Sequence, residues 1–569
     1  MLVTIPIWVY ILLMPLPYGW AMQMLISKWF KEPEESANLA VVWLLGLLTL
    51  TTLASVFSFF ISINLLAHAL LLAGAVIITF IWSRTHHGAI ARWFQSAKAI
   101  HGLAWLLLGF AVLTTLEIAT RVPSNPDTGL YHAQAIHWIE NYPVVPGLGN
   151  LHSRLAFNSS WLVTNALFSF IFLGGQSFHL VASVLFLVVL FYSGSAASQL
   201  LKNGLKFSSL FKVFLLPVAF YVLASEVSSP GTDLPVTLII WVVLAEWLTM
   251  LENNHKPSHT CAVVLFMITI YAVTIKLSSA PLVLVGVWLV FASDVKRQVN
   301  SLLKCAALGL MVALPWLGRN IIVSGYLIYP FPAIDLFKVD WKIPIAQAFD
   351  DQMAIQSWGK IPGHDIGVVA KMPLMQWFRE WWANLTTFRR WVLEDIIVMP
   401  FILALYGVVS RTFQRASLKF ITPLWPVYLV TYTGVAFWFF GSPDFRFGYG
   451  FLMAALFLSI SPWFILLRNL FSLSDTTLAS LLLVILIGFQ AFTLYKSVEW
   501  RTLPSRLILP ADYKSLPTAP CQLANAIVLQ PDKDSWSECW YNAFPCTPKC
   551  NSNVTLRGTS WGDGFRYPP

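Results

Sequence analysis

Long apolar stretches, separated by short polar segments, dominate the sequence. Each stretch holds roughly 20 mostly apolar residues, the length that a helix needs to span a bilayer. The pattern predicts an all-α polytopic membrane protein with about 14 transmembrane helices. The predicted spans lie near residues 3–27, 39–60, 63–82, 101–120, 178–200, 208–226, 233–251, 260–276, 278–293, 301–324, 394–411, 418–440, 447–468 and 476–496.

The composition agrees with this class of protein. Of the 569 residues, 57% are hydrophobic and 11% are charged, whereas soluble domains average about 25% charged residues. A disordered chain would have the opposite balance. The formal net charge is +9, but the basic residues are scattered between apolar runs and form no stripe for a nucleic acid. We therefore expect membrane lipids, and no nucleic acid, among the partners.

The orientation depends on residues 160–174, which are apolar but short for a span. If this stretch does not cross, one set of loops collects the basic residues, and the positive-inside rule makes that set cytoplasmic. We therefore expect a juxtamembrane helix there on the outer face. The long loops and the tail then lie on the non-cytoplasmic face, where we expect the active site. The basic residues are Lys28, Lys31, Arg84, Arg92, Lys202, Lys206, Lys212, Lys256, Lys296, Arg297, Arg411, Arg415, Lys419 and Arg468.

The polar tail 497–569 contains four of the six cysteines. Four cysteines in a small segment on an oxidising face favour two disulfides. Zinc binding is the alternative, but the spacing lacks a CxxC pair. The sequence leaves the pairing open, and the predicted result is a small disulfide-bonded tail over the outer face. The four residues are Cys521, Cys539, Cys546 and Cys550.

The first outer loop, 121–177, carries the first candidate for chemistry. Asn125-Pro126-Asp127 forms a predicted turn at the membrane surface, where the chain leaves a span, and a helix that carries His132 follows it. Asp127 is either the cap of that helix or a functional carboxylate at the boundary between water and lipid. In the second case it would take a proton from an acceptor hydroxyl or hold a divalent metal, Mg²⁺ or Mn²⁺, beside a phosphate.

Two more charged residues lie at the outer ends of later spans. Asp233 begins a span, either as its N-cap or as a second carboxylate on the active face. Lys276 ends a span, where it either reaches the interface with no other role or contacts a lipid phosphate.

Two basic residues in later segments favour phosphate recognition. Arg319, followed by Asn320, lies about one turn inside its span, where burial is expensive unless the guanidinium faces a partner or a polar cavity. Its planar fork suits phosphate oxygens. Arg446 lies in the short turn Gly441–Phe447, where it either pairs with Asp444 or joins Arg319 around a phosphate.

The second outer loop, 325–393, is rich in tryptophan. Its stretch MQWFREWWANL predicts an amphipathic helix at the membrane interface, where tryptophan rings lie at the level of the headgroups.

These motifs resemble the GT-C superfamily of integral-membrane glycosyltransferases. The resemblance rests on Asn125-Pro126-Asp127 with Tyr131-His132, on the helices within 131–174, and on Pro315-Trp316…Arg319-Asn320 before the long loop, and it covers roughly residues 100–500. On this basis residues 1–100 are additional N-terminal helices, 101–496 form the GT-C-like core, and 497–569 form the periplasmic tail. The paired acidic residues of protein mannosyltransferases are absent, so the acceptor class stays open.

The resemblance implies a polyprenyl-phosphate-linked sugar donor and a glycan, lipid or protein acceptor. It assigns Asp127 as the base or metal-holding carboxylate and Asp233 as a second catalytic carboxylate. The substrate contacts would be His132, Lys276, Arg319, Asn320, Asp444 and Arg446.

Two other functions remain open from the sequence. A lipid-linked polysaccharide polymerase or ligase would rely on the long loop, with Arg379, Arg389, Arg390 and His364. A transporter or flippase would place charged residues or broken helices near the bilayer midplane, whereas the polar features here gather at the outer ends of the spans.

Overall fold

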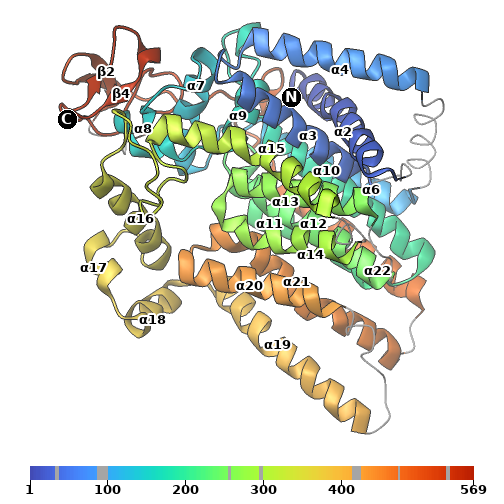
Figure 1. Cartoon of the computed structure of the whole chain (residues 1–569). Coiled ribbons are helices and arrows are strands. Elements are labelled where there is room, and N and C mark those ends of the chain that lie inside the picture. Colours follow the sequence, from blue (N-terminus) through green and yellow to red (C-terminus); the bar gives the residue numbers. More distant parts are fainter. Residues whose placement is uncertain are drawn as a thin grey trace.

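The computed structural model describes residues 1–32, 38–85, 100–253, 258–293, 299–412, 424–471, 474–532 and 538–568. Long helices lie side by side in one bundle, and shorter elements gather at one end of it (Figure 1). We call this end the loop end. The predicted cytoplasmic residues Arg92, Lys256, Lys296, Arg297, Arg415 and Lys419, and the predicted span residues 418–423, lie outside the described ranges.

Within these ranges, ten helical segments are long and apolar enough to cross a membrane, so the chain is a multi-pass membrane protein. They comprise α1 with α2 (Thr4–Leu13, Pro15–Phe30), α3 (Leu39–Phe57), α4 (Leu65–Thr85), α6 (Gly102–Ala119), α10 (Val181–Asn203), α11 (Phe207–Leu223), α12 (Asp233–Glu252), α15 (Val299–Ser324), α21 (Phe445–Phe471) and α22 (Asp475–Ser497).

Four predicted spans fall outside this set, although each contains a helix. α13 (His259–Ile275), the pair η5 (Leu277–Leu282) and α14 (Val283–Ala292), and α20 (Trp425–Gly441) are shorter than the ten. α19 (Thr387–Thr412) begins before the predicted 394–411, and its added first turns carry Arg389 and Arg390.

Residues 160–174 do not form a long helix. They contain α9 (Ser160–Leu167) and the short 3₁₀ turn η3 (Ile171–Leu173). Eight residues rise about 12 Å, well short of the roughly 30 Å hydrocarbon core. α9 is buried throughout and packs against α3, α7 (Ala133–Asn141) and α13. The expectation of a short helix is confirmed, and its juxtamembrane place on the outer face stays a prediction.

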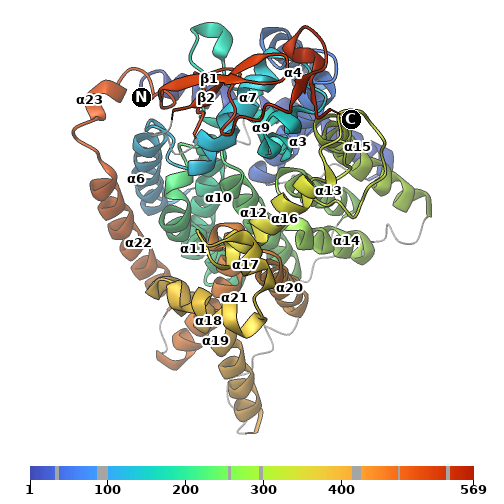
Figure 2. The ribbon, with the colours of Figure 1, turned by 90° about the vertical axis from the view of Figure 1, so that its left-hand side faces the viewer.

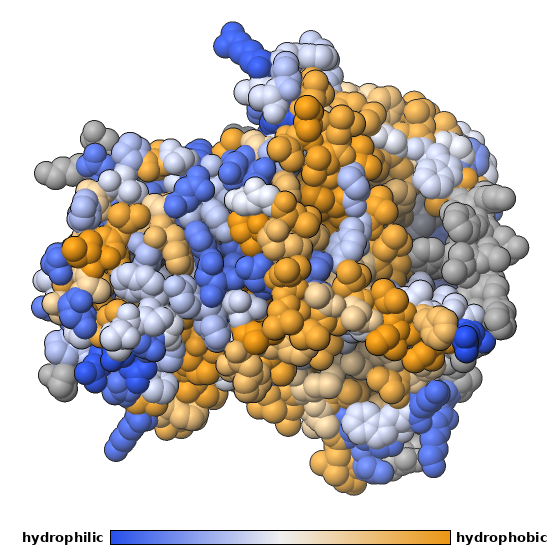
Figure 3. All heavy atoms as spheres, turned by 90° about the horizontal axis from the view of Figure 1, so that it is seen from above, coloured by the Kyte–Doolittle hydropathy of each residue, from blue (hydrophilic) through white to orange (hydrophobic). Residues whose placement is uncertain are grey.

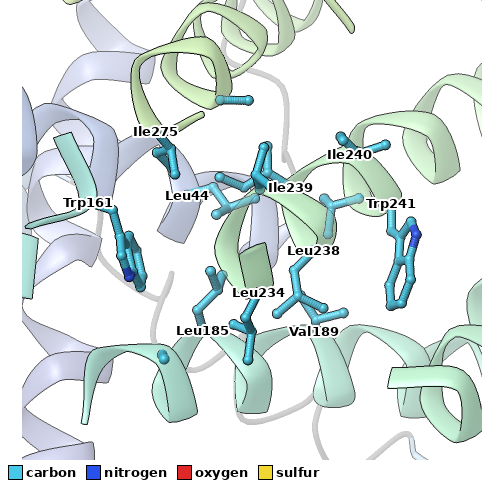
Figure 4. Close-up of a cluster of buried hydrophobic side chains, with 14 of the residues drawn as sticks. Leu44, Trp161, Leu185, Val189, Leu234, Leu238, Ile239, Ile240, Trp241 and Ile275 are labelled. Carbon is cyan, nitrogen blue, oxygen red and sulfur yellow. The ribbon is translucent and has the colours of Figure 1, made fainter. Parts of the chain in front are cut away.

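The core of the bundle forms around α12, which is buried along almost its whole length. A helix that is apolar on all sides belongs in a core. Figure 4 shows its side chains between those of α10, α3 and α13, and the one polar group of Trp241 is satisfied because its indole N–H donates to the Gly450 carbonyl at 3.0 Å. The cluster includes Leu44, Trp161, Leu185, Val189, Leu234, Leu238, Ile239, Ile240, Trp241 and Ile275.

The surface divides into an apolar and a polar region. Apolar side chains cover the long helices, whereas hydrophilic side chains gather at the loop end (Figure 3). Exposed leucine, isoleucine and phenylalanine side chains on α4 and α22 belong to the apolar region, among them Leu66, Ile77, Phe80, Leu481 and Phe492. Apolar surface of this extent is stable only in contact with lipid or protein.

The loop end is built from short elements. The first loop contains the π-helical turn η1 (Thr128–His132), α7, α8 (Leu148–Leu151) and the 3₁₀ turn η2 (Ser153–Ala156). The long loop contains α16 (Ile345–Lys360), α17 (Ile366–Lys371) and α18 (Leu374–Asn384), which confirms a helix over the tryptophan-rich stretch. Figure 2 shows these elements in front of the bundle.

The tail lies over the first loop. After α23 (Leu503–Arg506), β1 (Thr518–Gln522) pairs antiparallel with β2 (Ile527–Pro531). β3 (Thr555–Leu556) pairs with β4 (Phe565–Arg566), and a 3₁₀ turn, η8 (Trp561–Asp563), precedes β4. Cys521 is bonded to Cys550 and Cys539 to Cys546, which confirms the prediction of two disulfides and defines their pairing.

Candidate functional site

The side chain of Asp127 does not cap a helix. Asp127 precedes η1, but its carboxylate forms no capping hydrogen bond. Its backbone N–H donates instead to Asn125 Oδ1 at 2.8 Å, which fixes the turn. The carboxylate is therefore free to interact with other elements at the loop end.

Two arginines flank this carboxylate. Arg154 Nη1 lies 3.3 Å from Asp127 Oδ1, and Arg446 Nη1 lies 3.4 Å from Oδ2. Burial raises the pKa of Asp127, but its electrostatic interactions with His132, Arg446 and Arg154 outweigh burial and hold the pKa below its ordinary value. The carboxylate is therefore ionised at neutral pH. Both distances are long for charge-assisted hydrogen bonds, so a ligand can compete for these groups.

Arg446 also interacts with Asp444. Its Nε lies 3.6 Å from Asp444 Oδ2, and its backbone N–H donates to Oδ1 at 3.0 Å. Arg446 thus interacts both with Asp444 of its own turn and with Asp127 of the first loop. Arg154 of the first loop completes the group. It was not among the residues predicted from the sequence, where the only indication of its role is that it is basic and lies on the same loop as Asp127.

Asp233 and Lys276 form a second ion pair beside this group. The Asp233 side chain is almost fully buried, and Lys276 is about one-fifth exposed. The Lys276 ammonium lies 3.9 Å from the centre of the Phe447 ring, and the Arg446 guanidinium lies 5.6 Å from the same centre. The side chains of Lys276 and Arg446 therefore both lie near the Phe447 ring.

His132 lies buried next to these charges. Burial lowers its pKa to about 4, although the carboxylates of Asp127 and Asp233 act in the opposite direction. The ring is therefore neutral at pH 7. Neither ring nitrogen has a hydrogen-bond partner within the described part of the chain. An unsatisfied buried imidazole is costly, so His132 is a candidate ligand contact.

Asn125 connects this group to Glu226. Its Nδ2 donates to Glu226 Oε2 at 2.7 Å, and a Cβ at Gly231 would lie 2.8 Å from the same oxygen. The loop before α12 is thereby held tightly against the turn that carries Asp127. Six predicted residues thus come together: Asp127, His132, Asp233, Lys276, Asp444 and Arg446. We call them, with Arg154, the charged cluster.

Arg319 and Asn320 lie elsewhere. Arg319 is buried, and its guanidinium donates to Ser58 Oγ at 2.5 Å and to Asn158 Oδ1 at 3.1 Å. Asn320 donates to the Leu327 carbonyl at 3.0 Å. No carboxylate pairs with Arg319 within the described ranges. Arg446 pairs with Asp127 and Asp444, and within the described ranges no ion pair joins Arg319 to the cluster.

The tail packs directly on the turn that follows Asp127. Trp540 donates its backbone N–H to the Gly129 carbonyl at 2.9 Å. Gln134 donates to the Trp540 carbonyl at 2.7 Å, and the His137 ring stacks on Tyr541 with centres 4.2 Å apart. No local pattern predicts this contact, because it joins segments about 400 residues apart.

A divalent metal does not fit this arrangement. The oxygens of Asp127 already face two guanidinium groups, and cations next to a carboxylate oppose the binding of another cation. The described residues also contain no group of three or more His, Cys, Asp or Glu side chains arranged to hold a metal ion. We derive no step through a metal.

No curated protein and no solved structure matches the chain with significant similarity. One family model matches residues 1–453, which is most of the chain. The chain therefore belongs to the family described as a domain of unknown function, DUF8201.

Proposed function

We propose that this protein is a membrane glycosyltransferase of the GT-C type with about 14 spans. It would transfer a sugar from a polyprenyl-phosphate-linked donor to a glycan, lipid or protein acceptor. The observation that carries the proposal is the Asp127 carboxylate, ionised and loosely held between Arg154 and Arg446.

The disulfides of the tail indicate which side of the membrane the loop end faces. Disulfides persist in oxidising compartments, and both disulfides lie at the loop end with the charged cluster. We therefore propose that the loop end faces the periplasm of a bacterial inner membrane.

The cluster supplies the groups that such a transfer needs. The acceptor hydroxyl oxygen forms a bond to the anomeric carbon, the bond from that carbon to the phosphate oxygen breaks, and the phosphate leaves with the electron pair. Asp127 takes the proton of the hydroxyl, and Arg446, Arg154 and Lys276 stabilise the charge on the phosphate. Asp233 holds Lys276 in place, and His132 contacts the donor sugar.

The same arginines link donor binding to the strength of the base. They lower the pKa of Asp127 when no phosphate is present. A donor phosphate between them would offset their charge, so the pKa of Asp127 would rise and its carboxylate would become a stronger base. The base would then be strongest when the donor is bound. Arg319 and Asn320 remain candidate contacts to the lipid phosphate at the end of α15.

The test uses the full chain in lipid nanodiscs with polyprenyl-phosphate-linked glucose, mannose, galactose and N-acetylglucosamine, and it measures release of polyprenyl phosphate. Removing a general base typically costs about 10²- to 10⁴-fold in rate, so Asp127→Asn should lose at least about 100-fold. Asp340→Asn is the matched control, because Asp340 pairs with Arg557 on the tail surface. Full activity in Asp127→Asn would overturn the proposal.

A polysaccharide polymerase or ligase is the second candidate, because Arg389 lies against Phe445, the residue between Asp444 and Arg446 of the cluster. Its guanidinium lies 5.2 Å from the centre of the Phe445 ring, next to Arg446. Arg390 instead donates to the carbonyls of Trp382 and Ala383. A loss of activity in Arg389→Ala together with full activity in Asp127→Asn would favour this candidate.

A further inference from the structure

A cavity of about 460 Å³ lies beside the charged cluster, between the end of α6, the loop between α11 and α12, and the first part of the tail. Sites for small molecules have volumes of about 300–1,000 Å³, so the cavity is large enough for a small ligand. Neither the sequence motifs nor the proposed chemistry accounts for it.

The charges that line the cavity are balanced. Arg121 lies 3.2 Å from Glu499 and 2.6 Å from Glu117. Arg506 lies 2.9 Å from the other oxygen of Glu117. The two guanidinium groups of the lining thus pair with Glu499 of the lining and with Glu117, which lies outside it, so no unpaired positive charge is left for an anion such as a phosphate. A neutral ligand fits this balance better.

The remaining lining combines hydroxyls with small aliphatic side chains. Five hydroxyl residues line the cavity, and those of Ser225 and Ser228 form no hydrogen bond within the part of the chain that the structure describes. Hydroxyls both donate and accept, which suits the hydroxyls of a sugar, and the aliphatic groups suit its C–H faces. The hydroxyl residues are Ser124, Ser225, Ser228, Thr502 and Ser505.

The cavity shares a wall with the charged cluster. Ser229 Oγ accepts hydrogen bonds from the backbone N–H groups of both Ser124 and Asn125, each at 3.2 Å. Ser124 lines the cavity, whereas Asn125 fixes the turn of Asp127. A ligand in the cavity would therefore lie one short turn from the proposed base.

We propose that this cavity binds a neutral sugar unit and, resting on the proposed transferase activity, that it holds the acceptor glycan next to Asp127. The acceptor would then be a glycan, and the first part of the tail would contribute to its recognition.

The test measures sugar binding without a donor, so it does not depend on transfer. The full chain in nanodiscs is titrated with glucose, galactose, mannose, N-acetylglucosamine and rhamnose, and with inorganic phosphate, by saturation-transfer NMR. Ser225→Phe fills the exposed mouth of the cavity, Ser225→Ala removes only the hydroxyl, and Ser552→Phe places the same ring on an exposed site of the tail.

At least one sugar is expected to bind the wild type. Affinity should fall at least 10-fold in Ser225→Phe, several-fold in Ser225→Ala, and not in Ser552→Phe. The cavity proposal is wrong if no sugar binds, if both Ser225 variants bind as the wild type does, or if only phosphate binds. Sugar binding without any transferase activity would instead overturn the proposed function and leave the cavity as a sugar site.

Discussion

Asp127 and Arg446 are 319 residues apart in the sequence, yet Asp127 Oδ2 and Arg446 Nη1 lie 3.4 Å apart. One residue precedes a π-helical turn of the first loop, and the other lies in the first turn of α21. Their contact brings two segments that are far apart in the sequence together in one charged site. It also defines an electrostatic coupling that can be measured.

Removing the charge of Arg446 should change the pH dependence of activity. Because Arg446 lowers the pKa of Asp127, Arg446→Gln should raise that pKa and move the acidic limb of the kcat/KM profile to higher pH. Activity near neutral pH should fall about 10-fold or more. Arg446→Lys keeps the charge and should move the limb less. An unchanged acidic limb in Arg446→Gln would show that Asp127 is not the titrating base.

Gly129→Ala should disturb the site through the tail. An added Cβ would lie 2.6 Å from Trp540 Cε2, and Trp540 is almost fully buried, so it has little space to move. Overpacking of this kind costs about 1–3 kcal/mol. Activity and the melting temperature should both fall. Gly488→Ala on α22 is the control, since no atom lies within 4 Å of its added Cβ, and equal behaviour of the two variants would contradict the packing argument.

Docking of the tail should weaken as the pH rises. Glu140 is fully buried and accepts hydrogen bonds from Ser177 at 2.9 Å and from Tyr541. Burial raises its pKa from 4.5 to about 7, against the opposing hydrogen bonds. Because the pKa is raised in the folded state, the contribution of Glu140 to stability is fully present below pH 4.5 and is lost as the pH rises through about 7.

The shift corresponds to at most about 3 kcal/mol. Thermal unfolding of the wild type should therefore show a loss of stability between pH 5 and pH 8 that Glu140→Gln lacks. Identical pH profiles for the two proteins would show that Glu140 does not titrate in this range.

Removal of the two disulfides should affect stability and activity to different extents. The bond Cys521–Cys550 spans 29 residues and Cys539–Cys546 spans 7, so chain entropy gives about 3.5 and about 2.5 kcal/mol, respectively. The shorter loop, however, carries Trp540 and Tyr541, which contact the first loop. Serine substitution of Cys521 and Cys550 should cost more stability, whereas substitution of Cys539 and Cys546 should cost more activity. The reverse order in activity would remove the link between tail and site.

Much of the architecture follows from the sequence. Span-length apolar runs predict membrane helices because an isolated backbone in lipid must satisfy its own hydrogen bonds. Four cysteines in a short polar tail predict two disulfides. The short length of 160–174 predicts a short helix, and α9 confirms it. The number of spans is less well determined, because helices such as α13 and α20 fall near the minimum length.

The sequence also identified most of the charged cluster as separate candidates, because ionisable residues at the ends of apolar spans are rare and conspicuous. It did not determine their partners. Asp127 had two open interpretations, as a cap or as a functional carboxylate, and the geometry decides against the cap. Arg319 and Arg446 are both candidate phosphate contacts from the sequence, yet Arg446 lies at Asp127 and Arg319 lies against Ser58 and Asn158.

The sequence by itself therefore determined the class of protein, the approximate places of its helices and the residue types at their ends, since hydropathy and spacing are local properties. Only the tertiary structure decided which charges pair, how the cysteines pair, and that Trp540 packs on Gly129. The contacts of Asp127 with Arg446 and of Gly129 with Trp540 join residues separated by hundreds of positions. They depend on how buried helices pack around α12, which no local pattern specifies.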